Sequence, residues 1–165
     1  MTAFGGTSSS ATGGNEQRFA SRQWQVIYAV AFCGATSFPL ALLAIAVGLP
    51  WNVLLAAGAA VSLVYGLAQA FRIALIVNAD QITVRNFGRS YRIVWPEVSA
   101  IELREEIALG NVRSRLVTFV RRPPKEPVEA YATLSRKVRR EALRALQPLA
   151  TEVGVTFDIP KDVYE

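Results

Sequence analysis

The chain has 165 residues, of which 52% are hydrophobic, and a formal net charge of +5. Its single cysteine excludes an internal disulfide framework, and the absence of histidine removes the commonest general base and metal ligand from any catalytic scheme. From residue 72 onward, 16 Lys and Arg stand against 12 Asp and Glu, an excess that indicates either polyanionic partners or a well-solvated surface.

The N-terminal half of the chain is predicted to form a transmembrane hairpin. Residues 1–23 open with Gly, Ser, Thr and Ala, which cannot bury a core, so we expect a disordered tail. An uncharged run then covers residues 24–47, with Gln25 as its one clearly polar side chain. This run is longer than the roughly 20 residues that span a bilayer, and longer than the apolar region of a signal peptide. Gly and Pro interrupt it at residues 48–52, and a second uncharged run covers residues 53–71.

Charge at the ends of the hairpin predicts its orientation. Arg18 and Arg22 precede the first helix, Arg72 follows the second, and the connecting turn has no charge. Because positive flanks stay on the cytoplasmic side, we expect a plasma-membrane protein with two spans and both termini in the cytoplasm.

Small residues recur at every fourth position of the second helix, at Gly58, Ser62 and Gly66. Such a face lets another helix approach closely. That helix is either the first one of the same hairpin or one from a partner, meaning another membrane protein or a second copy of this chain.

After Arg72 the pattern becomes strand-like. Short alternating or β-branched runs, separated by turns that contain Asn, Asp, Gly or Pro, predict six strands. These runs cover residues 73–78, 81–87, 91–95, 98–104, 115–120 and 128–132. Evenly spaced short strands predict an antiparallel β-sandwich or partial barrel, and Trp95 is expected to pack in or at the edge of its core.

A helix from Ser135 to Leu149 follows, because Ser135 is a good N-cap and the helical period returns. Its predicted apolar stripe consists of Val138, Ala142, Ala145, Leu146 and Leu149. Its predicted exposed basic face consists of Arg136, Lys137, Arg139, Arg140 and Arg144. Pro148 is expected to end or kink this helix. The predicted fold is therefore a membrane α-hairpin plus an α+β domain over residues 72–151, capped by one amphipathic helix, with an irregular tail at 152–165.

One stretch resembles a known family. Ile82-Thr83-Val84-Arg85-Asn86, then Gly88-Arg89, then Arg92-Ile93-Val94-Trp95-Pro96-Glu97-Val98 is similar to the bacterial pleckstrin-homology (PH) domain of actinobacterial membrane proteins. The resemblance implies a PH-like sandwich behind a two-helix hairpin, acting as a binding or scaffolding module. It does not extend to inositol-phosphate recognition. The first turn, Asn78-Ala79-Asp80, is short and acidic where the eukaryotic phosphoinositide-binding members carry Lys and Arg.

No pattern in the sequence indicates catalysis. Phosphate-binding loops, dinucleotide fingerprints and metal-ligand spacings are absent from it, and the nearby Glu102, Glu105 and Glu106 are expected to be solvated charges. We therefore expect a protein that is not an enzyme and that has no cofactor or metal.

Two basic groups are the candidate contacts for anionic lipid or for a partner. Arg85, Arg89 and Arg92 straddle one β-hairpin, and the five basic residues named above crowd the C-terminal helix. Ordinary solvated faces remain the alternative. Nucleic acid is not expected, because the basic helix lacks interleaved aromatic residues. The sequence thus favours a cytoplasm-facing, membrane-anchored binding or assembly module. The alternatives are an accessory subunit of a larger membrane complex and an anionic-lipid sensor.

Overall fold

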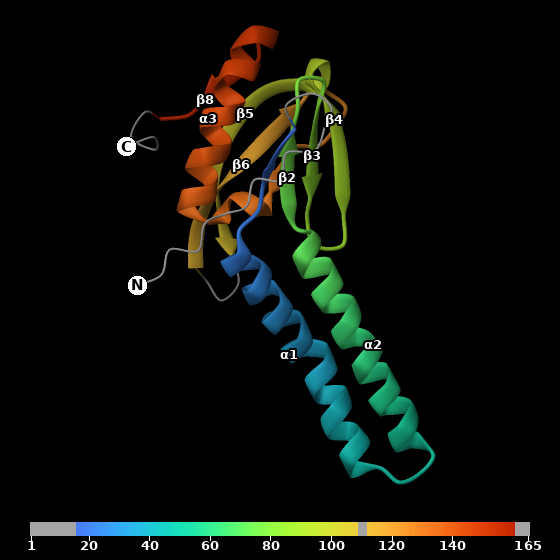
Figure 1. The fold of residues 1–165 in the computed structure, drawn as a ribbon. Coiled ribbons are helices and arrows are strands. Elements are labelled where there is room, and N and C mark those ends of the chain that lie inside the picture. The colour runs from blue at the N-terminus through green and yellow to red at the C-terminus, as the bar shows by residue number, and fades with distance from the viewer. Residues whose placement is uncertain (1–15, 109–111, 161–165) are drawn as a thin grey trace.

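The computed structural model describes residues 16–108 and 112–160. Two long helices project from a body of two β-sheets and one further helix (Figure 1). The helices are α1 (Arg22–Ala46), α2 (Trp51–Arg72) and α3 (Arg136–Val153), with short 3₁₀ helices η1 (Trp95–Glu97) and η3 (Tyr131–Leu134). The strands are β1 (Gln17–Phe19), β2 (Ala74–Val77), β3 (Gln81–Arg85), β4 (Ser90–Val94), β5 (Val98–Ala108), β6 (Val112–Arg121), β7 (Val128–Ala130) and β8 (Thr156–Asp158). The predicted order, a helical hairpin followed by an α+β domain, is confirmed.

The helical hairpin matches its predicted bounds to within two residues at each end. Both helices are long and apolar enough to cross a membrane. Most of their large apolar side chains point away from the protein, and Ile45 and Val61 are 83% and 69% exposed. Ser21 begins α1 as its N-cap, because its Oγ accepts a hydrogen bond from the Trp24 N–H at 3.4 Å.

The body contains two four-stranded sheets, which are not closed into a barrel in the described part of the chain. The first has the order β1-β2-β3-β4, and every neighbouring pair in it is antiparallel. The second has the order β7-β6-β5-β8, where β5 and β8 run parallel. The prediction of an antiparallel architecture is therefore correct for the six strands that the sequence indicated.

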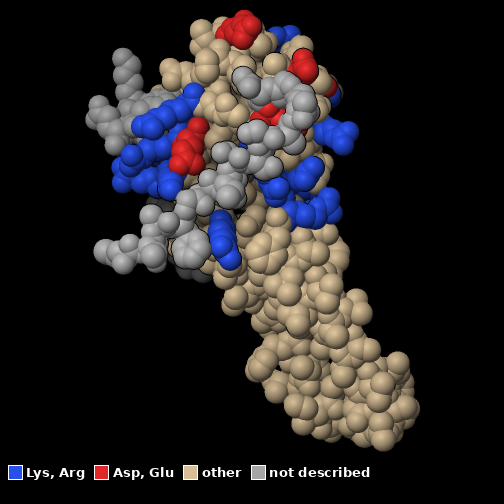
Figure 2. All heavy atoms as spheres, viewed as in Figure 1, with Lys and Arg blue, Asp and Glu red and all other residues tan. Residues whose placement is uncertain are grey.

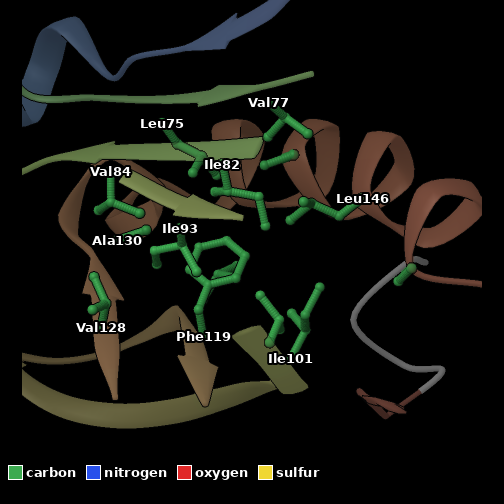
Figure 3. Packing of buried hydrophobic residues seen from close by; sticks show 14 of the residues in the cluster. Leu75, Val77, Ile82, Val84, Ile93, Ile101, Phe119, Val128, Ala130 and Leu146 are labelled. Atoms are coloured by element: carbon green, nitrogen blue, oxygen red, sulfur yellow. The ribbon is translucent and has the colours of Figure 1, made fainter. Parts of the chain in front are cut away.

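The core lies between the inner faces of the two sheets and under α3 (Figure 3). In β3, Ile82 and Val84 are buried while the residues between them are partly exposed, as the alternation predicts. Leu75, Ile93, Phe119, Val128 and Leu146 converge on the same core from the other elements.

Trp95 is 2% exposed, and its indole Nε1 donates to the Asn78 carbonyl oxygen at 3.0 Å. Its predicted structural place is confirmed. The bond fastens η1 to the turn between β2 and β3. That turn is shaped by the Asn78 side chain, whose Oδ1 accepts from the backbone N–H groups of Asp80 and Gln81.

Helix α3 packs by an apolar face that is shifted from the predicted stripe. Ala142 and Leu146 are buried as expected, and Leu143 and Ala150 are buried beside them. The helix also continues to Val153, beyond its predicted end at Leu149, so Pro148 does not end it. Pro148 is exposed, so water can bond the carbonyl group that lacks its donor. The helix ends instead at Gly154, which adopts the left-handed conformation with φ +74°.

The domain extends at both ends beyond the predicted residues 72–151. Gln17–Phe19, predicted to lie in a disordered tail, pairs with β2 as an edge strand. Thr156–Asp158, predicted to lie in an irregular tail, pairs with β5. Three-residue strands are too short to show an alternating pattern, and backbone pairing with a neighbouring strand is what defines them. The rest of both predicted tails, residues 1–15 and 161–165, lies outside the described residues.

Candidate functional site

The junction between hairpin and domain is short and tightly bonded. One residue separates α2 from β2, and two residues separate β1 from α1. Gln25 of α1 is 7% exposed, and its Nε2 donates to the carbonyl oxygens of Phe71 at 3.2 Å and Ile73 at 3.0 Å. The one clearly polar side chain of the first apolar run therefore supplies donors for carbonyl groups at the C-terminal end of α2.

Aromatic rings pack the domain against the first turns of α1. The ring of Tyr28 lies 6.2 Å from that of Tyr131 in η3 and 6.4 Å from that of Phe87, in the turn between β3 and β4. Phe87 also lies 5.0 Å from Phe32, again between ring centroids. Such pairs contribute about 0.5–1.5 kcal/mol each beyond the area they bury. The helix and the domain are thus joined by packing as well as by chain continuity.

The small-residue face of α2 is directed largely toward α1. The hydroxyls of Ser62 and Thr36 share a hydrogen bond of 2.8 Å. A Cβ added at Gly66 would collide with Phe32 Cδ1, whereas one at Gly58 would meet nothing within 4 Å. Of the two interpretations left open by the sequence, packing within the hairpin accounts for Ser62 and Gly66.

The first basic group surrounds the turn between β3 and β4. Arg85 and Arg92 belong to the outward faces of β3 and β4, and Arg89 is exposed in the turn. Asn86 fixes this turn to the second sheet: its Nδ2 donates to the Glu129 carbonyl oxygen at 2.6 Å, and its Oδ1 accepts from the Tyr131 N–H at 3.1 Å. The turn is therefore held in place beside α1.

The second basic group lies on the first half of α3. Arg136, Lys137 and Arg144 are exposed as predicted. Arg139 is instead half-buried, and its guanidinium donates to the carbonyl oxygen of Arg115. The prediction that the whole basic face is exposed is thus wrong for Arg139, because its position on the helix brings it over β6, and also for Arg140, which is partly buried.

Like charges crowd Arg139. Its pKa is lowered by burial, and further by the positive charges of Arg115, Arg136 and Arg140. Its Nε is buried without a hydrogen-bond partner among the described residues. A hollow of about 400 Å³ runs alongside, lined by Arg136, Lys137, Arg140, Glu141 and Arg144. A cationic cluster of this kind is suited to an anion.

The basic side chains form more than one group on the domain. Figure 2 shows Lys and Arg on the part of the domain nearest the hairpin, on its flank over α3 and also at its far end, while the hairpin itself is free of charge below the domain. The contacts agree, because Phe87 places the first group beside α1, and η3, which packs on α1, directly precedes the second group.

Two further hollows adjoin Phe87. An apolar one of about 260 Å³ is lined by Tyr28, Ala31, Phe32 and Phe87. A polar one of about 400 Å³ is lined by Asn86, Phe87, Arg89, Tyr91, Pro127, Val128, Glu129 and Tyr131. Sequence reasoning identified Arg89 but missed Phe87 and Glu129 as its neighbours. An aromatic residue in a turn between basic strands was the available signal for Phe87.

The carboxylates that the sequence brought together are engaged at the surface. Glu102 Oε2 pairs with Arg104 Nε at 3.3 Å, and Glu105 Oε1 pairs with Arg115 Nε at 3.1 Å. The Glu106 side chain lies outside the described residues. Residues 16–108 and 112–160 contain no cluster of three metal-ligating side chains. Comparison of the chain with protein-family models, curated proteins and solved structures finds no match.

Proposed function

We propose that this chain is a membrane-anchored, non-catalytic binding module that is held at the bilayer surface in one orientation. The observation that carries the proposal is the bonded junction, in which Gln25 and the rings around Tyr28 fix the domain to α1. A domain on a flexible linker samples many orientations. Here the same basic face meets the membrane surface continuously.

Exposed apolar surface supports insertion of the hairpin into lipid. The exposed apolar side chains of α1 and α2 form a contiguous surface that must be shielded from water. Both helices are uncharged and long enough to span a bilayer, so lipid can shield them. Trp51, at the tip, is 65% exposed and suits the far interface. The flanks Arg18, Arg22 and Arg72 favour a cytoplasmic domain. A reporter fused after Glu165 should therefore be active only in the cytoplasm, and activity on the other side would refute this topology.

A PH-like architecture fits this role. Two sheets followed by one C-terminal helix, together with the stretch from Ile82 to Val98, support the resemblance to bacterial PH domains. In this setting the domain acts by binding rather than by chemistry.

Anionic lipid is the ligand that the basic side chains favour. Each Lys or Arg close to an anionic leaflet contributes about 1 kcal/mol. The first basic group surrounds the β3–β4 turn beside α1, and the second begins directly after η3, which contacts α1. The accessory-subunit and self-association alternatives drew on the small-residue face of α2, of which Ser62 and Gly66 already pack against α1. The lipid interpretation is therefore the stronger one.

Hydrogen exchange of the full chain in nanodiscs tests this proposal. We expect the first two turns of α3 to exchange more slowly when phosphatidylglycerol is added to phosphatidylcholine, and added salt should reverse the effect. Changing Arg136 and Arg144 together to Gln should abolish it. The matched control changes Arg122 and Lys125 to Gln, in the loop between β6 and β7 at the far end of the domain (Figure 1). Equal exchange in both lipids would refute anionic-lipid binding.

A further inference from the structure

Two opposite charges line the polar hollow beside Phe87 without pairing with each other. Arg89 and Glu129 both contribute to its wall. Within the described part of the chain, the ion pairs are Glu102–Arg104, Glu105–Arg115 and Glu97–Lys125, which include neither residue. A guanidinium and a carboxylate that face one hollow and stay apart present a cation-binding and an anion-binding group to the same ligand.

The remaining polar groups orient these two charges. The Asn86 amide is occupied on both sides by backbone groups of Glu129 and Tyr131. The Tyr131 hydroxyl donates to Glu129 Oε2 at 3.4 Å, which directs the carboxylate and leaves its other oxygen atom to accept from a ligand. The wall is therefore arranged to meet one anionic and one hydrogen-bond-donating group.

The depth of the hairpin places this hollow at the level of lipid headgroups. From Phe32 to the end of α1 at Ala46 the helix rises only about 21 Å, at about 1.5 Å per residue. A bilayer core is about 30 Å thick, so hydrocarbon must reach at least to Phe32. The apolar hollow at Ala31 and Phe32 then lies in hydrocarbon, and the polar hollow, which shares Phe87 with it, lies at the headgroups.

We propose that the junction binds one phospholipid with a primary-ammonium headgroup, of the phosphatidylethanolamine type. Its phosphate lies at Arg89, its ammonium donates to Glu129, and one acyl chain fills the apolar hollow against Ala31 and Phe32. Phosphatidylglycerol fits less well because the hollow contributes one positive and one negative charge. Phosphatidylcholine fits less well because its quaternary ammonium has no N–H to donate. This proposal depends on the proposed function in one respect, the insertion of the hairpin into the membrane. It does not depend on lipid binding by α3.

Native mass spectrometry of the full chain, released from mild detergent with an equimolar mixture of the three phospholipids, tests this site. We expect one phosphatidylethanolamine to be retained about tenfold over each of the other two, which corresponds to about 1.4 kcal/mol. Arg89→Gln should lower its retention about tenfold. Glu129→Gln should shift the preference toward phosphatidylglycerol, an effect that a merely structural role would not produce.

Matched control variants distinguish a specific effect at the hollow from a general effect of removing charge. Arg122→Gln and Glu126→Gln make the same changes at exposed positions outside the hollow and should leave retention unaltered. Ala31→Trp should fill the apolar hollow and displace the lipid even if the polar variants fold poorly. Equal retention of the three lipids by the wild type, or identical behaviour of Glu129→Gln and Glu126→Gln, would overturn the proposal. If phosphatidylethanolamine is retained selectively but phosphatidylglycerol does not slow exchange in α3, anionic-lipid binding by α3 is refuted and the phosphatidylethanolamine site stands.

Discussion

Replacing Gln25 with methionine is expected to loosen the junction between the hairpin and the domain. The side chain is 7% exposed, and its Nε2 donates to two carbonyl oxygens, those of Phe71 and Ile73. Methionine has a similar length and flexibility but no N–H group. The substitution therefore removes both hydrogen bonds and nearly preserves the packing.

The expected loss follows from the surroundings of the two acceptors. The bond to the Ile73 oxygen is buried, so this oxygen loses its donor without access to water, which costs about 1–3 kcal/mol. The bond to the Phe71 oxygen is only partly buried, and its net contribution is about 0.5–1.5 kcal/mol. The greater hydrophobicity of methionine offsets about 1 kcal/mol. The junction should therefore lose about 1–3 kcal/mol, which raises its local opening constant about 5- to 150-fold.

Hydrogen exchange with mass spectrometry on the full chain in detergent micelles measures this opening directly. Peptides that cover β2, which directly follows the bonded carbonyl of Ile73, should exchange faster in the Gln25→Met variant by that factor. Gln23→Met is the matched control, because Gln23 is exposed on the same turn of α1. If the two variants exchange at the same rate in β2, the Gln25 amide does not hold the domain to the hairpin.

Four further substitutions test the packing. Trp95→Ala should lower the free energy of unfolding by about 3–5 kcal/mol, and Leu146→Ala by about 2–5 kcal/mol, in urea titrations of the full chain in detergent, because both side chains are fully buried. A loss below about 1 kcal/mol in either would contradict that burial. Gly58→Ala should raise the melting temperature through helix propensity. Gly66→Ala should fail to raise it, because the added Cβ displaces the Phe32 ring. Equal gains at both glycines would mean that the helices do not pack as described.

The sequence alone was sufficient for the features that depend on local pattern. The two membrane-spanning helices can be recognised from the sequence without tertiary information. Each charged residue has its own cost of transfer into lipid, so the absence of charge over a sufficiently long run is enough to identify a span. Half-buried strands such as β3 were visible because burial on one face imposes alternation, and the fully buried β2 was visible as a short β-rich run. The turn at Asn78 was visible because its side chain bonds its own backbone.

Tertiary structure decided whatever depends on neighbours that are distant in sequence. Gln25 looked like an isolated polar residue in an apolar run, and only the return of the chain at Phe71 and Ile73 gives its amide partners. Arg139 looked like any other residue of a basic face until the position of β6 buried half of it. The edge strands β1 and β8 exist because β2 and β5 offer backbone groups for pairing.

The polar hollow beside Phe87 likewise depends on residues that are distant in sequence. Its walls come from the β3–β4 turn, from β4, from the chain around β7 and from η3, and the adjoining apolar hollow adds α1. No spacing along the sequence places Arg89 and Glu129 in the wall of one hollow, because they come from the β3–β4 turn and from β7, which belong to different sheets. Periodicity and composition indicate which side of a helix or strand is buried. Which residues pack against that side is determined only when the whole chain folds.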